Sequence, residues 1–281
     1  MTIATEIRRP LGTMIVYGYP KGDPAVDLAI ALRLGAEVVE VLPLWSAYPD
    51  PTAIRDRVAD HGLTIHSAHG CWGGQRIRAS RVDLGSTDPA TRSASLDDLK
   101  RCVDWLGEAG GSCLVVHPGG LSDAEEGEAR GRVLADGLVA LADHAAGAGL
   151  IVCVENMPPG VHPGSRMDEL FAIVAAIDHP RLALALDTGH GHLGGDLGAE
   201  TLAAGRLLRT THVHDNDGRH DSHLPPGLGS VDWGSWIERL DAIDYRGPIM
   251  LECIRNLREK PESLDDSLVR LLWRMCGLGG S

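Results

Sequence analysis

Eight short apolar segments recur along this 281-residue chain and constrain its fold more than any other feature. They are rich in Val, Ile and Leu and do not alternate with polar residues, which is typical of parallel strands buried on both faces. The predicted strands are Thr13–Tyr17, Val38–Val41, Thr64–Ser67, Cys113–Val116, Ile151–Val154, Leu182–Leu186, Thr210–Val213 and Pro248–Leu251.

Longer helical patterns fill the intervals, and several begin with Asp or Pro, as helix starts do. The predicted helices are Asp23–Leu34, Asp50–Asp60, Asp88–Ala109, Arg130–Ala146, Met167–Ala176, Leu197–Leu207, Trp233–Ile243 and Ser263–Met275. Strand–helix units of this kind suit a closed barrel or a doubly wound open sheet. No GxGxxG motif follows the first strand, which disfavours the nucleotide-binding open sheet. We therefore predict one α/β domain over residues 1–281, a single (β/α)8 TIM barrel with frayed ends at 1–10 and 277–281.

Charge and cysteine usage narrow the partners and the compartment. The formal net charge of -13 repels a phosphate backbone, so we expect no nucleic-acid partner. Six cysteines without a CxxC pair indicate a reducing compartment, and the opening MTIATEIRRPLG lacks the apolar stretch of a signal peptide. No run approaches the roughly 18 apolar residues of a membrane span. The sequence thus predicts a cytoplasmic protein without a membrane partner, and it leaves a homo-oligomer open.

Side chains that can bind metal stand at the ends of the third to eighth predicted strands, which converge on one mouth in a barrel. A carboxylate that directly follows an apolar strand would be costly to bury alone, and a bound cation removes that cost. Glu155, Asp187 and Glu252 fit this description, and with His214 they form a set of three carboxylates and one imidazole. Such a set suits Mn²⁺, Zn²⁺, Co²⁺ or Fe²⁺. We therefore predict a divalent-metal site at the carboxyl ends of the strands.

Each of these residues taken alone has a structural interpretation as well. A lone His at a strand end is more often hydrogen-bonded in the structure than bound to metal, and a lone Glu is as readily an ion-pair partner. Residues of this kind on six successive strands are hard to explain independently, which favours one shared site. The tract after the seventh strand adds Asp221 and His223, which could offer two ligands from one extended stretch.

Six motifs mark these strand ends in the order HSAHG, VVHPGG, VENMPPG, LDTGHGH, HVHDNDGRHDSHLPPGLGSVDW and MLEC. In this order, from the third strand onward, they resemble the xylose isomerase-like TIM-barrel superfamily. That superfamily joins sugar isomerases and epimerases with zinc-dependent abasic-site endonucleases. The motifs are specific for the superfamily but not for one activity.

Resemblance to the ketose epimerases implies that Glu155, Asp187, His214 and Glu252 hold one metal. It also implies that Glu155 and Glu252 move the proton next to a carbonyl through a metal-stabilised ene-diolate. The substrate would be a sugar or a sugar phosphate. The expected substrate-binding residues are Trp45, Trp72, Asn156 and Arg219. Core roles for the two tryptophans remain open, and the longer loop around Arg219 departs from a simple ketose 3-epimerase.

Resemblance to the abasic-site endonucleases implies a cluster of up to three metals that hydrolyses phosphodiesters. The residues that match its ligand pattern are His69, His117, Glu155, Asp187, His190, His214, Asp221, His223 and Glu252. The negative charge opposes this alternative, and Arg76, Arg78 and Arg81 form the one candidate phosphate-binding patch. A third alternative is a metal-dependent lyase or dehydratase on a keto-sugar or keto acid, which begins with the same proton abstraction. We favour the isomerase or epimerase.

Overall fold

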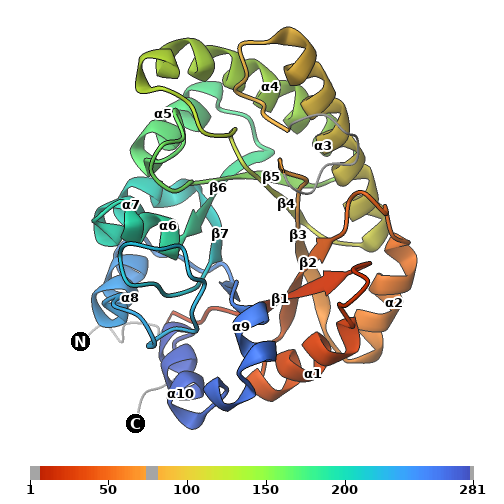
Figure 1. Cartoon of the computed structure of the whole chain (residues 1–281), viewed down its shortest axis with the longest axis vertical. Helices are drawn as coiled ribbons and strands as arrows, with labels where there is room; N and C mark the ends of the chain where they lie inside the picture. The colour runs from red at the N-terminus through yellow and green to blue at the C-terminus, as the bar shows by residue number, and fades with distance from the viewer. Residues whose placement is uncertain (1–6, 74–81, 279–281) are drawn as a thin grey trace, which may run out of the picture.

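The computed structural model describes residues 7–73 and 82–278. Eight parallel strands form one sheet in the order β7-β6-β5-β4-β3-β2-β1-β8, which curls into a barrel (Figure 1). The strands are β1 (Leu11–Tyr17), β2 (Val38–Pro43), β3 (Thr64–His69), β4 (Cys113–Val116), β5 (Ile151–Glu155), β6 (Leu182–Asp187), β7 (Leu208–His212) and β8 (Ile249–Leu251). The predicted TIM barrel is confirmed.

The barrel is nearly closed at the seam between β7 and β8, which are the two ends of the strand order. β1 pairs with both β2 and β8. On the other side of β8, Val213 just after β7 forms a parallel bridge with Leu251. The Val213 N–H donates to the Met250 carbonyl at 2.7 Å, and the Glu252 N–H donates to the Val213 carbonyl at 3.0 Å. These bonds place the residue after β8 beside the end of β7.

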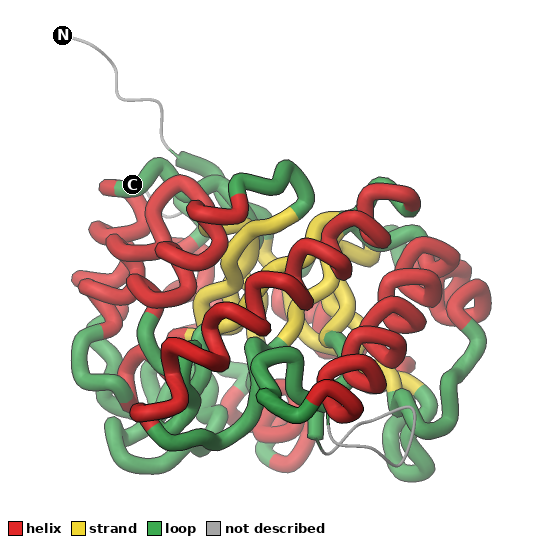
Figure 2. The backbone as a smooth tube through the Cα atoms, turned by 90° about the horizontal axis from the view of Figure 1, so that it is seen from above, coloured by secondary structure: helices red, strands yellow, loops and turns green. Residues whose placement is uncertain are grey.

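Helices surround the strands on the outside of the barrel (Figure 2). They are α1 (Pro24–Leu34), α2 (Pro51–Asp60), α3 (Pro89–Ala109), α4 (Gly127–Gly147), α5 (Met167–Ile177), α6 (Thr188–Leu193), α7 (Leu197–Ala204), α8 (Trp233–Ala242), α9 (Ile254–Glu259) and α10 (Asp266–Met275). The helix starts follow the expected signals, because Asp23, Asp50 and Asp88 cap α1, α2 and α3 and Pro follows each cap. Two short helices that were not predicted, α6 and α9, directly follow β6 and β8.

Packing around Arg9 corrects the expected fraying of residues 1–10 for the part just before β1, whereas residues 1–6 lie outside the described residues. The Arg9 side chain is 1% exposed and donates to the carbonyls of Tyr245 and Met275, and it pairs with Asp241. Arg9 therefore ties the chain just before β1 to the segments around α8 and α10. Among the described helices, none is long and apolar enough to span a membrane.

Candidate metal centre

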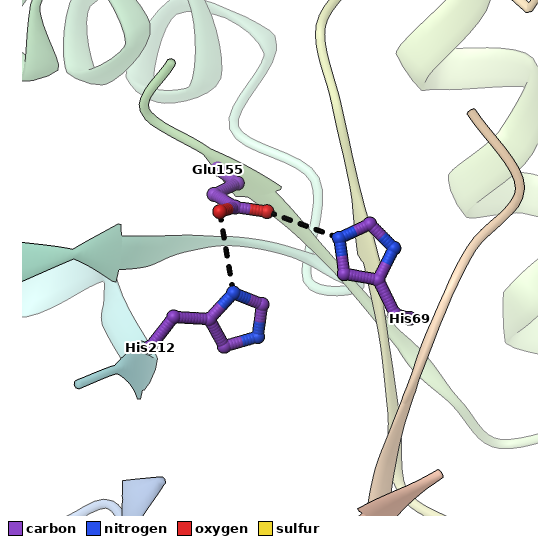
Figure 3. A group of neighbouring side chains, drawn as sticks. All are labelled: His69, Glu155 and His212. Atoms are coloured by element: carbon purple, nitrogen blue, oxygen red, sulfur yellow. Dashed lines mark hydrogen bonds and ion pairs between the residues drawn. The ribbon is translucent and has the colours of Figure 1, made fainter. Parts of the chain in front are cut away.

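Three groups of His, Asp and Glu side chains meet at the carboxyl ends of the strands, and the inner and central groups share Glu155 and His212. The inner group joins β3, the segment after β4, and β5. His69 Nε2 and His117 Nε2 each lie 3.5 Å from Oε2 of Glu155. Figure 3 shows how Glu155 reaches toward His69 with one oxygen and toward His212 with the other. Glu155 is 1% exposed, so the three imidazoles enclose a buried carboxylate.

The central group consists of Glu155, Asp187, His212 and Glu252, whose ligand atoms all lie within 4.8 Å of one another. His212 Nδ1 lies 3.2 Å from Glu155 Oε1 and 3.0 Å from Glu252 Oε2. Asp187 and His212 are fully buried, whereas the Glu252 side chain is 18% exposed. Glu252 is therefore the member of this group that a molecule entering the barrel mouth can reach.

The outer group gathers His214, Asp221 and His223, and His190 lies beside it. Asp221 Oδ2 is 3.5 Å from His190 Nε2 and 3.3 Å from His223 Nε2. The rings of His214 and His223 stack with their centroids 3.9 Å apart. His214 Nε2 also lies 3.0 Å from an oxygen of Asp187, so this ring bridges the outer and central groups.

The structure brings the predicted site residues together but pairs them differently from the expected four-residue set. His214 lies against Asp187 and Asp221, while His212 takes the place next to Glu155 and Glu252. Residues two apart in an extended segment point to the same side, so both imidazoles face the mouth. The predicted strand ended at Val213, and the predicted ligand, His214, lay just beyond it. The strand itself ends at His212.

The residues fit a divalent cation on two observations. Glu155 Oε2, Glu252 Oε2 and His214 Nδ1 are buried, and within residues 7–73 and 82–278 none of them makes a hydrogen bond of regular geometry, although imidazole nitrogens lie 3.0–3.5 Å from the two carboxylate oxygens. In the same part of the chain, the ion pairs of Glu155, Asp187 and Glu252 are all with histidines, not with Lys or Arg. Buried carboxylates that lack a permanent positive partner are expensive unless a cation is bound.

Without a cation, the imidazoles compensate the charge of the carboxylates. Burial opposes ionisation of Glu155, yet the adjacent His212 and the other imidazoles hold the pKa of Glu155 well below its ordinary value. Burial also disfavours a charged His190, but the negative Asp187 outweighs it and raises the pKa of His190 to about 10. Burial likewise disfavours a charged His223, but its hydrogen bond to Asp221 raises the pKa of His223 to about 10. At neutral pH these imidazoles therefore carry protons.

Metal binding is expected to release protons and to strengthen as the pH rises from 6 toward 9. An imidazolium has no lone pair for a metal, so a cation must displace the protons that the raised pKa values of His190, His212 and His223 retain. Calorimetric titration of chelator-treated protein with Mn²⁺ or Zn²⁺, in buffers of different ionisation enthalpy, measures the number of protons released. An affinity independent of pH over this range would contradict the assignment of imidazoles as ligands.

Asn156 and Trp45 were both predicted to bind substrate. In the structure they are buried and hydrogen-bond to the backbone of site residues. The buried Asn156 amide accepts from the Asp187 N–H at 2.7 Å and donates to the Asp187 carbonyl at 3.1 Å. It therefore holds Asp187 in place. Trp45 is fully buried, and its indole N–H donates to the His69 carbonyl at 3.0 Å. A contact between Trp45 and a bound sugar has no support, because the ring lies in the core.

Trp72 and Arg219 lie closer to solvent. The half-buried Trp72 ring lies 4.8 Å from the His69 ring and 6.1 Å from the His117 ring, so Trp72 stands at the mouth. Arg219 is exposed in the loop after β7, and only its backbone N–H bonds within the loop, to Asp217. The arginine patch Arg76, Arg78 and Arg81 lies outside the described residues.

The loop after β7 is organised by Asp215, which sequence reasoning did not single out. Its buried carboxylate accepts from the N–H groups of Asn216 at 2.9 Å, Gly227 at 2.8 Å and Val231 at 3.1 Å. The Trp233 indole donates to it at 3.0 Å. The Asp215 carboxylate thus holds together both ends of the loop that carries Asp221 and His223. Its position directly after His214, just beyond the end of β7, was the available signal.

A cavity of about 870 Å³ opens beside the central and outer groups. Glu252, His223 and Asp221 form part of its lining, and Met14 and Tyr19 contribute apolar surface from β1 and the segment that follows it. Lys21, Arg255 and Arg258 also line it. Its volume lies in the range of small-molecule sites. The proposed ligands therefore border a space large enough for a monosaccharide.

The chain is similar to proteins of two enzyme types, ketose epimerases and endonuclease 4-like proteins. The family model of the xylose isomerase-like TIM barrel matches residues 28–271. An L-ribulose 3-epimerase from Methylomonas sp. (strain DH-1) is 29% identical over 242 residues, covering 80% of this chain and 76% of that protein. A probable endonuclease 4 from Thermoplasma acidophilum is 28% identical over 210 residues, covering 68% of this chain and 69% of that protein.

A solved structure agrees with this placement. The crystal structure of a D-allulose 3-epimerase from Methylomonas sp. in complex with D-allulose matches with a TM-score of 0.70 and 25% sequence identity. The match covers 87% of this chain and 84% of that chain. With a family model that spans most of its length and the barrel that the family shares, the chain belongs to the xylose isomerase-like TIM-barrel family.

Proposed function

We propose that this chain is a divalent-metal-dependent epimerase or isomerase of a ketose or ketose phosphate. The observation that carries the proposal is the placement of Glu155 and Glu252. Both glutamates face one imidazole nitrogen of His212, and the site they form borders the cavity. The likeness to a ketose epimerase over most of both chains supports the same activity.

Two carboxylates at one site suit a proton transfer that inverts or moves a stereocentre. A cation held by Glu155, Asp187, His212 and Glu252 would act as a Lewis acid toward the sugar carbonyl. Glu155 is ionised at neutral pH because its pKa is depressed, which is the form that a general base needs. One glutamate removes the proton beside the carbonyl, and the other delivers a proton to the opposite face. Asn156 holds Asp187 rigid while this happens.

Solvent-deuterium exchange tests this function directly. Protein loaded with Mn²⁺ is incubated in D₂O with a panel of ketopentoses, ketohexoses and their phosphates, and the products are followed by NMR. The proposal expects deuterium at the carbon next to the carbonyl, together with a new epimer or aldose. Loss of a hydroxyl would indicate a dehydratase instead. Absence of exchange across the whole panel would overturn the proposal.

A second candidate is a multi-metal phosphodiesterase, and the outer group is the observation that favours it. Asp221 Oδ2 lies 3.5 Å from His190 Nε2 and 3.3 Å from His223 Nε2, and neither contact involves Glu155. The outer and inner groups together could hold more than one cation. Elemental analysis of protein purified without chelator separates the candidates. One equivalent of metal favours the epimerase, and two to three equivalents of zinc call for an assay of cleavage at abasic sites.

Asp221→Ala is expected to leave one metal equivalent bound and to perturb substrate binding. The central group contains no atom of Asp221, whereas the cavity is lined by it. Elemental analysis and the KM for the ketose measure the two effects. The control is Asp217→Ala, because Asp217 is an exposed residue of the same loop that pairs with His220. Loss of all metal in Asp221→Ala, with normal content in the control, would point to a coupled cluster.

A further inference from the structure

A buried carboxylate lies inside the barrel next to the proposed metal centre. Glu40 stands in the middle of β2 and is fully buried. The Ser67 hydroxyl on β3 donates to its Oε2 at 2.5 Å, and its Oε1 lies 2.9 Å from His212 Nε2. Among the described residues, the ion pair of Glu40 is with His212 and not with Lys or Arg. The Glu40 carboxylate thus links β2 to β3 through the Ser67 hydroxyl and to β7 through the His212 imidazole.

An irregularity in the sheet directs Glu40 to this position. The register of β2 against β3 shifts between Val39 and Glu40, so that Glu40 lies opposite Ser67. Register shifts of this kind re-aim a side chain and are common beside active sites. Because His212 ends β7 on the far side of the barrel, the contact spans the interior, and local packing within β2 alone does not account for it.

The contact fixes which nitrogen of His212 faces the ligands. A carboxylate accepts hydrogen bonds, so Glu40 selects the imidazole tautomer that carries its proton on Nε2. The Nδ1 atom lies 3.2 Å from Glu155 and 3.0 Å from Glu252, so its lone pair would be the one that a cation bound between these carboxylates uses. The ring of His69 stacks on His212 with centroids 5.7 Å apart and holds its plane. The ring can therefore offer Nδ1, and not Nε2, to a cation in the central group.

We propose that Glu40 is a positioning residue that orients His212 with Nδ1 toward the cation of the central group. A carboxylate behind a metal-binding imidazole fixes its orientation and raises its basicity. Glu40 itself does not line the cavity, so it acts through His212 and not on substrate. The inference rests on the proposed function only in taking the central group as the metal site.

Glu40→Ala and Glu40→Gln test the proposal against the control Thr211→Val. Thr211 lies on β7 directly before His212, is as buried as Glu40, and donates to the Pro248 carbonyl and not to an imidazole. Mn²⁺ affinity is measured by calorimetry on chelator-treated protein, and kcat and KM are measured at saturating Mn²⁺. Glu40→Ala is expected to weaken Mn²⁺ binding by about 10–100-fold with little change in KM. Glu40→Gln should lie in between, because its amide oxygen still accepts from Nε2–H without the charge.

A spectroscopic readout separates positioning from a merely structural role. Long-range ¹⁵N–¹H correlation on protein saturated with diamagnetic Zn²⁺, in which a metal-bound His212 is neutral, is expected to show the His212 proton on Nε2, and a mixture of tautomers in Glu40→Ala. Thr211→Val should lower the unfolding temperature but keep the wild-type tautomer and Mn²⁺ affinity. If Glu40→Ala fails to fold, Glu40→Gln carries the same comparison.

The outcomes keep the two proposals apart. Wild-type Mn²⁺ affinity in both Glu40 variants would overturn the role of Glu40, whatever the turnover. A wild-type protein that binds Mn²⁺ but exchanges no ketose proton would overturn the proposed function. In that case a loss of Mn²⁺ affinity in Glu40→Ala would still support Glu40 as the residue that positions His212.

Discussion

Glu155→Gln is expected to lower kcat by roughly two to four orders of magnitude, the usual contribution of a general acid or base. The amide cannot take up a proton from carbon. It also removes a negative charge that the structure places at 3.2 Å from His212 and at 3.5 Å from His69 and His117. Weaker metal binding should therefore accompany the loss of turnover. Steady-state kinetics at saturating Mn²⁺, with a separate metal titration, distinguish the two effects.

Two other Glu→Gln variants accompany this prediction, one as a parallel test and one as a control. Glu252→Gln removes the second proposed acid–base group and should show a comparable loss. Glu128→Gln alters a side chain on α4 that is 86% exposed and pairs with Arg132, so its kinetics should be those of the wild type. Full activity in both Glu155→Gln and Glu252→Gln would sink the proposed mechanism.

Asp215→Ala is expected to reduce the free energy of unfolding by about 3 kcal/mol, because it leaves several buried donors without an acceptor. The donors are three backbone N–H groups and the Trp233 indole. The loop is wrapped closely around this carboxylate, since a Cβ on Gly229 would lie 2.3 Å from its Oδ1. Urea unfolding of the metal-free protein measures the loss, and hydrogen exchange shows whether the loop over residues 215–233 opens.

A variant on the same loop provides the comparison for Asp215. Asp217→Ala changes an exposed carboxylate, so it should alter stability by no more than about 0.5 kcal/mol. The central group should keep its metal in Asp215→Ala, because none of its four side chains lies on the loop. A stability equal to that of Asp217→Ala would show that water replaces the acceptor without loss.

The strands could be predicted because burial on both faces leaves a continuous apolar run in the sequence. In β7 the polar run Arg209–His212 hides the strand start at Leu208. The helices α6 and α9 escaped prediction because each has only six residues and α6 contains two glycines. Glycine is required at position 189 because the His214 ring packs against its Cα, and a Cβ there would lie 1.9 Å from that ring.

The sequence could predict which residues belong to the candidate site, but not which of their side chains contact one another. Glu155, Asp187 and Glu252 stand out because a carboxylate follows an apolar strand, and that pattern survives in the sequence alone. Whether His212 or His214 meets Glu155 depends on the twist of the barrel and on where β7 ends. Glu40 is harder still, because its partner lies 172 positions away in the chain. Such a contact exists only after the barrel interior is assembled.

The topology also sets when a cation can be captured during biosynthesis. The central group takes its side chains from β5, β6, β7 and the residue after β8, and β8 completes the barrel by pairing with β1. Glu252 leaves the ribosome long after Glu155, so a nascent chain that stops short of the last strand has an incomplete set of donors. The full set of donors therefore exists only after β8 has joined β1, so a cation can be held by all four side chains only once the barrel is closed.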